Sequence, residues 1–390
     1  MEEIRIYCEN TQSYVKVAMG NTLKDLAAVL FPDADLDCGL PVLAALVDNK
    51  LKSLDYKIIN PHNVRFIGYD HPDGRRTYIR SLCFVLQNVV REMFPDKVLA
   101  IDYSLPSGLY CDIREPEPTD NGLPRRIFLT DEQIEDIEAR MREIVDADLP
   151  FGKKMLSLEE CCLLFGKNNQ KEKVNLLKSI GRFNYNVYFL DGQADTFYGP
   201  LVPSTGLLTT FNLMGFNDGF CLQYPLDGQP GKVLPMKRQS KIASALNEYS
   251  DWCAVMGMHG VGSLNARVHS GKMIDLINLS EALHERKYAE IANQIYERRG
   301  SVKIVFIAGI IAGLRAWMPS IMSMSFSCSC IKSPLKYLFP SLKSKRGIST
   351  SLPSRRSLSC CPRKSRSMAS RASKSYSPSA SRGVRCLSTK

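Results

Sequence analysis

The sequence predicts an α+β protein built from several domains, and three observations carry this prediction. Residues 3–7 alternate between apolar and polar side chains, as half-buried strands do. Residues 134–145 place Ile and Val at helical spacing along one face. Residues 302–308 form a nearly unbroken, β-branched apolar run, typical of a strand buried on both faces. A length of 390 residues favours two or three domains.

Residues 1–67 form the first predicted domain. Strands are expected at 3–7 and 14–17, and a helix with a polar cap begins at Asn21 and Thr22. A strand at 42–47, a turn at 48–50 that runs on to Leu54, and a strand at 64–67 complete a ββαββ order. This order is typical of a ubiquitin-like β-grasp fold. The turn region resembles the TGS domains attached to threonyl-tRNA synthetases and to some GTPases.

Residues 68–225 form the second predicted domain. A helix ends at Phe94 before Pro95, a strand follows at 98–103, and Thr130 with Gln133 forms a capping box that begins a second helix. Another helix begins near Ser157, a strand covers 186–190, and Gly199-Pro200 precedes Val202-Pro203. Together these segments resemble the second additional domain of threonyl-tRNA synthetases, an editing-type domain shared with alanyl-tRNA synthetases. The resemblance covers residues 63–225.

The resemblance also implies a site. In the editing family, an H-x-x-x-H motif on the first helix and a C-x-x-x-H motif before a late strand gather around an ester bond or a metal. The matching positions here are Arg80 and Phe84, then Phe197 and Leu201. An arginine, two phenylalanines and a leucine cannot perform that chemistry. The second domain is therefore interpreted as a binding or structural module with no catalytic residue and no metal.

Residues 226–300 are predicted to be a linker followed by a helical connector. Helices are expected at 241–258 and 272–299. The segment 260–265 has two glycines but follows no strand, so we interpret it as a helix–helix turn rather than a phosphate site. His259, His269 and His284 are too widely spaced for a local metal site.

Residues 301–309 have the pattern of the first strand of a P-loop domain, with Gly309 where a phosphate loop would begin. The loop requires a second glycine, a lysine and a hydroxyl residue at fixed spacing. Leu314, Arg315 and Ala316 occupy those positions. The nucleotide-binding motif is incomplete as written.

This order of domains resembles the long nucleoside kinases of the uridine kinase family. The resemblance covers residues 1–309 and implies ATP, Mg²⁺ and a nucleoside as the ligands of the parent family. Its catalytic residues lie almost entirely after the position of Gly309. No cofactor is therefore expected for this chain.

Residues 310–390 form a basic tail that is predicted to be disordered. This tail holds 16 of the 51 Lys and Arg side chains, none of the 40 Asp and Glu, and 22 serines. The residues before it carry a net charge of about −5, against +16 for the tail. Two origins remain open, namely a natural basic arm and a change of reading frame near codon 309.

The 13 cysteines and the N-terminal residues predict the cellular compartment. None of the eight cysteines before residue 310 belongs to a C-x-x-C pair, and the first ten residues lack the apolar core of a signal peptide. The longest apolar run, 304–314, is about half of a membrane span. We therefore expect a cytoplasmic protein with reduced thiols and no membrane partner, whose oligomeric state is left open.

The sequence supports two alternative hypotheses for the function. The first is a truncated or frame-disrupted relative of the nucleoside kinases, inactive as a phosphotransferase. The alternative is a non-enzymatic module that binds RNA or tRNA, because both predicted N-terminal domains occur in tRNA-handling enzymes. A basic tail would add salt-dependent binding to phosphates.

Overall fold

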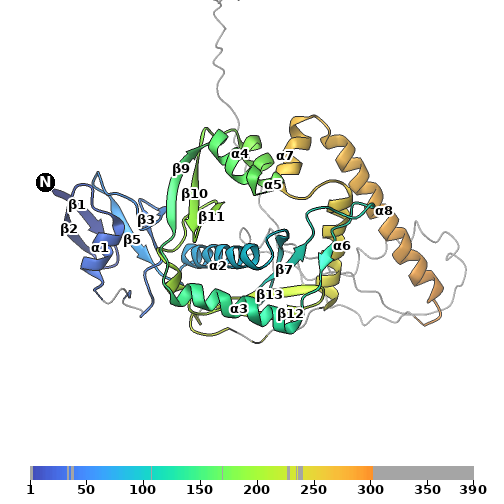
Figure 1. Cartoon of the computed structure of the whole chain (residues 1–390), viewed down its shortest axis with the longest axis horizontal. Coiled ribbons are helices and arrows are strands. Elements are labelled where there is room, and N and C mark those ends of the chain that lie inside the picture. The colour runs from blue at the N-terminus through green and yellow to red at the C-terminus, as the bar shows by residue number, and fades with distance from the viewer. Residues whose placement is uncertain are drawn as a thin grey trace, which may run out of the picture. The chain divides into compact units, whose positions relative to one another are not determined.

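The structure is a computed structural model that describes residues 3–301 apart from 33, 34, 37, 38, 107, 169, 226–228, 234 and 236–239 (Figure 1). Helices and strands mix along the described part of the chain, so the predicted α+β class is confirmed. The predicted strand at 302–308, the loop positions Gly309, Leu314, Arg315 and Ala316, and the tail 310–390 lie outside the described residues.

A five-stranded sheet and one helix form the N-terminal part. The strands are β1 (Glu3–Cys8), β2 (Ser13–Ala18), β3 (Ala44–Val47), β4 (Lys50–Lys52) and β5 (Asn63–Ile67), in the order β2-β1-β5-β3-β4. β1 pairs antiparallel with β2 and parallel with β5, as a β-grasp requires. Helix α1 (Leu23–Leu30) begins at a capping box between Thr22 and Asp25 and buries Leu23 and Leu26 in the same core as Ile6 and Phe66.

The short strand β4 was not predicted. Asp48 and Asn49 have φ angles of 48° and 61°, so both lie in the left-handed region. Two such residues close a tight hairpin whose twist matches its strands. The turn predicted at 48–50 therefore returns the chain as β4 along β3, instead of running on directly to Leu54.

Helix α2 (Pro72–Met93) is the centre of the next part. Along its 22 residues it buries eleven, among them Leu82, Phe84, Leu86 and Val89. These side chains share one core with helix α3 (Asp131–Asp146) and with side chains of both neighbouring sheets. Figure 1 shows α2 running through the middle of these elements. The predicted helix end before Pro95 and the capping box at Thr130 are both confirmed.

Two sheets contribute to this core. The first contains β6 (Val98–Leu105), β7 (Gly108–Arg114), β8 (Arg126–Ile127), β12 (Asn212–Phe216) and β13 (Gly219–Gln223), with the path β12-β13-β7-β6 and β8 beside β7. The second has the order β11-β10-β9, with β9 (Gly152–Ser157), β10 (Asn184–Leu190) and β11 (Gln193–Thr196). Asn88 of α2 donates a hydrogen bond to the carbonyl of Leu190 at 2.9 Å, which joins the helix to the second sheet.

Two short helices, α4 (Leu158–Lys167) and α5 (Lys171–Ile180), connect β9 to β10. The predicted helix start near Ser157 is confirmed, and the Ser157 side chain forms a capping box with Glu160. Cys161, Phe165 and Leu177 bury a small core with Val187 of β10. A 3-10 turn, η1 (Thr205–Leu207), follows the loop after β11.

Three helices end the described part: α6 (Ser240–Val255), α7 (Val261–His269) and α8 (Met273–Glu297). The predicted helices at 241–258 and 272–299 are confirmed. The interpretation of residues 260–265 as a turn is wrong, because α7 begins at Val261. Gly262 packs so closely on α5 that a Cβ there would lie 2.6 Å from the carbonyl oxygen of Glu172, so glycine permits this helix contact.

α6 is fixed to the first sheet by polar contacts. The Tyr103 hydroxyl donates to Asn247 at 2.9 Å, and Arg126 bridges the buried Asp112 and Asp251 of α6. Among the described residues, no helix is long and apolar enough to cross a membrane.

Candidate binding site

The structure brings the four predicted site positions to one place. Arg80 and Phe84 lie on α2, whereas Phe197 and Leu201 lie in the loop after β11. The rings of Phe84 and Phe197 have centroids 5.3 Å apart, and Phe84 also stacks on Phe151 at 5.9 Å. Leu201 is only 2% exposed and belongs to the same core. We call Phe84, Phe151, Phe197 and Leu201 the apolar cluster.

Arg80 ties this loop to α2. Its guanidinium donates a hydrogen bond to the carbonyl of Pro200. Gly199 has a φ of 153°, and a Cβ at this position would lie 2.9 Å from the guanidinium carbon. The close approach therefore requires glycine. Burial lowers the pKa of Arg80, whose task here is to hold backbone.

A second hydrogen bond holds the same loop. The Ser81 hydroxyl accepts from the amide of Val202 at 2.9 Å and donates to the carbonyl of Thr77. The Tyr188 hydroxyl donates to the carbonyl of Gly199 at 3.3 Å. The loop from Phe197 to Val202 is thus fixed from both α2 and β10, and all three side chains are bonded to backbone groups.

The apolar cluster offers no group for acid–base, nucleophilic or metal chemistry. Its side chains are hydrocarbon, and the nearest thiol on α2, Cys83, has its pKa raised to about 12 by burial. A thiol with that pKa stays protonated at neutral pH and is a poor nucleophile. Within the described residues, no group of three His, Cys, Asp or Glu side chains is placed to hold a metal ion.

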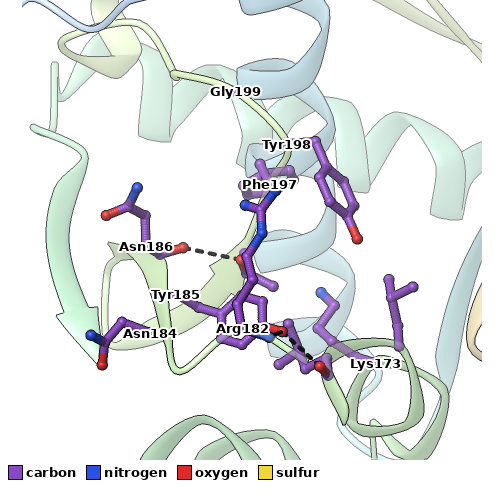
Figure 2. A pocket seen from close by; sticks show the side chains of 11 residues that line it. Lys173, Arg182, Asn184, Tyr185, Asn186, Phe197, Tyr198 and Gly199 are labelled. Atoms are coloured by element: carbon purple, nitrogen blue, oxygen red, sulfur yellow. Dashed lines mark hydrogen bonds between the residues drawn. The ribbon is translucent and has the colours of Figure 1, made fainter. Parts of the chain in front are cut away.

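An open pocket of about 360 Å³ lies beside the apolar cluster, and Phe197 belongs to both (Figure 2). α5, β10 and the loop after β11 supply its wall. The lining residues are Lys173, Leu176, Leu177, Arg182, Asn184, Tyr185, Asn186, Thr196, Phe197, Tyr198 and Gly199. Two of these eleven side chains are cationic and none is acidic, so the pocket suits an anionic or polar ligand.

Arg182 and Tyr198 form the rim of this pocket, and Phe183 lies between the lining residues Arg182 and Asn184 in the sequence. Phe183 is 88% exposed and Tyr198 is 70% exposed. The backbone beneath them is fixed, because the amide of Arg182 donates to the Tyr185 hydroxyl at 3.3 Å and the amide of Leu158 donates to the carbonyl of Phe183 at 2.9 Å. Within the described part of the chain, the Arg182 guanidinium has no hydrogen-bond or ion-pair partner.

Lys173 is occupied by a different contact. Its ammonium group pairs with Asp195, which is 1% exposed and also meets Arg91 at 3.5 Å. Burial lowers the pKa of Arg91 to about 10, so its guanidinium remains charged at neutral pH. Burial also lowers the pKa of Lys173, to about 7, so Arg91 is the partner that stays fully charged. Both side chains meet the buried carboxylate and fix β11 against α2 and α5. Arg182 is left as the pocket cation that is available to a ligand.

The rim residues were not among the predicted site positions. A signal for them is present in the sequence, where Gly181-Arg182-Phe183 separates a helix from a strand. Gly181 has a φ of 69° and ends α5, so the next two side chains are forced out of the regular elements. An arginine and an aromatic ring at such a bend indicate a contact surface.

The structure argues against a phosphate site at the N-terminus of α7. The carboxylate of Glu172 accepts from the backbone amide of Ser263 at 3.1 Å and from its hydroxyl at 2.6 Å. A side-chain anion thus already occupies the position that a phosphate would take. This contact joins α5 to α7.

Comparison with known proteins points to one group of enzymes. The chain is 30% identical over 173 residues to the threonine–tRNA ligase of Desulforamulus reducens and 31% identical over 173 residues to that of Carboxydothermus hydrogenoformans, in both cases 44% of this chain and 26% of the relative. The threonine–tRNA ligase of Clostridium kluyveri is 26% identical over 212 residues, which is 54% of this chain and 31% of the relative. No family model matches the chain.

The chain thus spans between a quarter and a third of the length of these curated relatives. The matches cover about half of the chain and support the part of the resemblance that concerns threonyl-tRNA synthetases. The fold agrees with this resemblance, because a β-grasp part is followed by an editing-like α+β part. The resemblance to nucleoside kinases stays a prediction.

Proposed function

We propose that residues 3–225 form a non-catalytic module that binds RNA, with tRNA as the first candidate. The observation that carries the proposal is the rim of the open pocket, where the Arg182 guanidinium has no partner among the described residues and the Tyr198 ring is exposed. Aromatic rings stack on unpaired bases, and arginine pairs with phosphates. The relatives are named for a reaction on tRNA, which indicates the class of ligand.

The apolar cluster explains why the module binds without reacting. Phe84, Phe197 and Leu201 stand where the editing-type resemblance implies imidazole and thiol groups. Hydrocarbon side chains leave a bound ester intact. A ligand bound at the rim would therefore be released without having reacted.

The test is the affinity of the full chain for a fluorescently labelled tRNA, measured by fluorescence anisotropy. We expect Tyr198→Ala to weaken binding roughly 5- to 100-fold, because base stacking contributes about 1–3 kcal/mol per base and Tyr198 is 70% exposed. Phe128→Ala is the matched control, since Phe128 is also 70% exposed but lies away from the pocket, before α3. Equal affinities of the two variants would contradict the proposal.

The salt dependence of the affinity distinguishes RNA binding at the rim from RNA binding by the tail. The 16 cations of residues 310–390 bind phosphates whatever the fold, and this contribution falls steeply as salt rises. Measured at high salt, Arg182→Gln should still weaken binding relative to Arg65→Gln, an exposed arginine of β5. Loss of all binding at high salt, in the parent chain as well, would mean that the tail alone binds RNA.

The second candidate function remains the nucleoside kinase relationship. It rests on the order of the predicted domains and on the apolar run that ends at Gly309. With Leu314, Arg315 and Ala316 at the loop positions, the loop lacks the glycine that lets backbone amides surround a phosphate. We therefore expect no ATP-dependent phosphorylation of uridine or cytidine by the purified chain. Turnover above a no-enzyme blank would contradict this expectation.

A further inference from the structure

Helix α8 leaves its apolar residues uncovered. None of its 25 residues is buried, and Ile274 and Tyr288 are 69% and 70% exposed. On the side that faces α6, Lys287 pairs with Glu248 at 2.5 Å; at the edge of that side the ring of His284, which is itself exposed, meets Trp252 at 6.2 Å. Figure 1 shows α8 as the long orange helix beside α6.

Six exposed side chains and the partly buried Ile295 have the spacing of a helix–helix seam. They follow one another at alternating steps of three and four residues, which is the 3.5-residue period of a coiled coil. The stripe spans about 31 Å at 1.5 Å per residue. We call these seven residues the α8 stripe: Ile274, Ile277, Glu281, His284, Tyr288, Ile291 and Ile295.

The α8 stripe is complementary to itself when reversed. With a second α8 laid antiparallel and His284 opposite His284, Ile274 meets Ile295 and Ile277 meets Ile291. In the same register Glu281 meets Tyr288, whose hydroxyl can donate to the carboxylate. In a parallel register each residue meets its own copy, so two Glu281 carboxylates would face each other at a cost.

We propose that the α8 stripe is a self-association surface whose occupant is a second, antiparallel copy of this chain. The inference is independent of the proposed RNA binding. The competing occupant is the basic tail, residues 310–390. Of the seven stripe residues only Glu281 is acidic, so the tail's charges have little to pair with there. The four isoleucines instead favour an apolar partner with the same period.

The first test is sedimentation equilibrium of the full chain over a range of concentrations. We expect a monomer–dimer equilibrium that persists at high salt. Ile291→Asp should weaken it at least tenfold, and Ile277→Asp should do the same. Leu279→Asp is the matched control, because Leu279 is 49% exposed on the same helix but lies off the stripe, and its equilibrium should be unchanged. A chain that stays monomeric at every concentration overturns the proposal.

The second test fixes the direction. His284→Cys should give a crosslink between position 284 of one copy and position 284 of the other, whereas Ile274→Cys should give none between its own two copies. The chain already has 13 cysteines, so the links are assigned by peptide mass mapping against the parent chain. A link joining position 274 to position 274 would establish a parallel pair and overturn the antiparallel register.

Discussion

The apolar cluster and the open pocket lie on the two sides of one ring. Phe197 packs on Phe84 with one part of its surface and lines the pocket with another. On the cluster side its neighbours are the rings of Phe84 and Tyr188. On the pocket side the lining combines apolar side chains with amides, hydroxyls and the guanidinium of Arg182, which has no partner among the described residues. The first side belongs to the core, and the second is the side that the proposed ligand would contact.

This difference separates the residues that stabilise the fold from those that we propose bind a ligand. Large apolar side chains at the positions that the editing-type resemblance marks add buried area and offer no titratable group. The loop geometry that presents Tyr198 is meanwhile retained through Arg80, Ser81 and Tyr188. Substitutions on the two sides should therefore act on different measurements.

The largest effect is expected for Phe84→Ala. Phe84 is fully buried and contacts two further rings, so the substitution leaves a large cavity. We expect a loss of about 3–5 kcal/mol in the free energy of unfolding, measured by chemical denaturation. A loss below about 1 kcal/mol would mean that the apolar cluster is not part of the core.

The next effect is expected for Asp195→Asn. The change leaves Lys173 and Arg91 facing each other without the buried carboxylate between them. Removing one partner of a buried ion pair costs about 3 kcal/mol, at the lower end of the usual range because both cations keep some contact with water. Thermal unfolding checks this value, and an unchanged melting temperature would show that the pair contributes nothing.

Gly199→Ala should cost less, about 2 kcal/mol, because the alanine must adopt a φ near 153° and its Cβ presses on Arg80. The control is Gly166→Ala in α4, where nothing lies within 4 Å of the added methyl group. That change should be neutral or slightly stabilising, since alanine favours helix. Equal effects at both positions would argue against the close approach of the loop to α2.

The smallest effect on stability is expected at the rim. Tyr198→Ala removes a ring that is 70% exposed, so the free energy of unfolding should change by less than about 0.5 kcal/mol. The same variant should bind RNA several-fold more weakly than the parent chain. If it unfolds readily, its binding defect would be structural and the separation of the two sides would fail.

The local elements were largely predictable from sequence. Capping boxes at Thr130 and Ser157, the stop before Pro95 and the helical spacing of α3 all depend on neighbouring residues, so a single sequence reveals them. α7 was missed because Gly260 comes directly before it and Gly262 lies in its first turn, and closely spaced glycines usually mark a turn. Close packing on α5 outweighs that tendency.

The site was predictable only in part. The four positions Arg80, Phe84, Phe197 and Leu201 follow from the family resemblance, and the structure places them together. The pocket depends on contacts between residues far apart in the sequence, such as Lys173 with Asp195. Such long-range pairs leave no local pattern, so the sequence can mark Arg182 and Phe183 at the bend after Gly181 but cannot show that Tyr198 lines the same pocket as Arg182.

The most direct test of the central claim is hydrogen–deuterium exchange of the full chain with and without tRNA, at a salt concentration that suppresses binding by the tail. The account predicts slower exchange on tRNA binding in residues 182–186 and 196–199, with little change in β1 and β2 at the far end of the described chain. Protection confined to residues 310–390, or absent from the pocket, would contradict the claim that the pocket binds RNA.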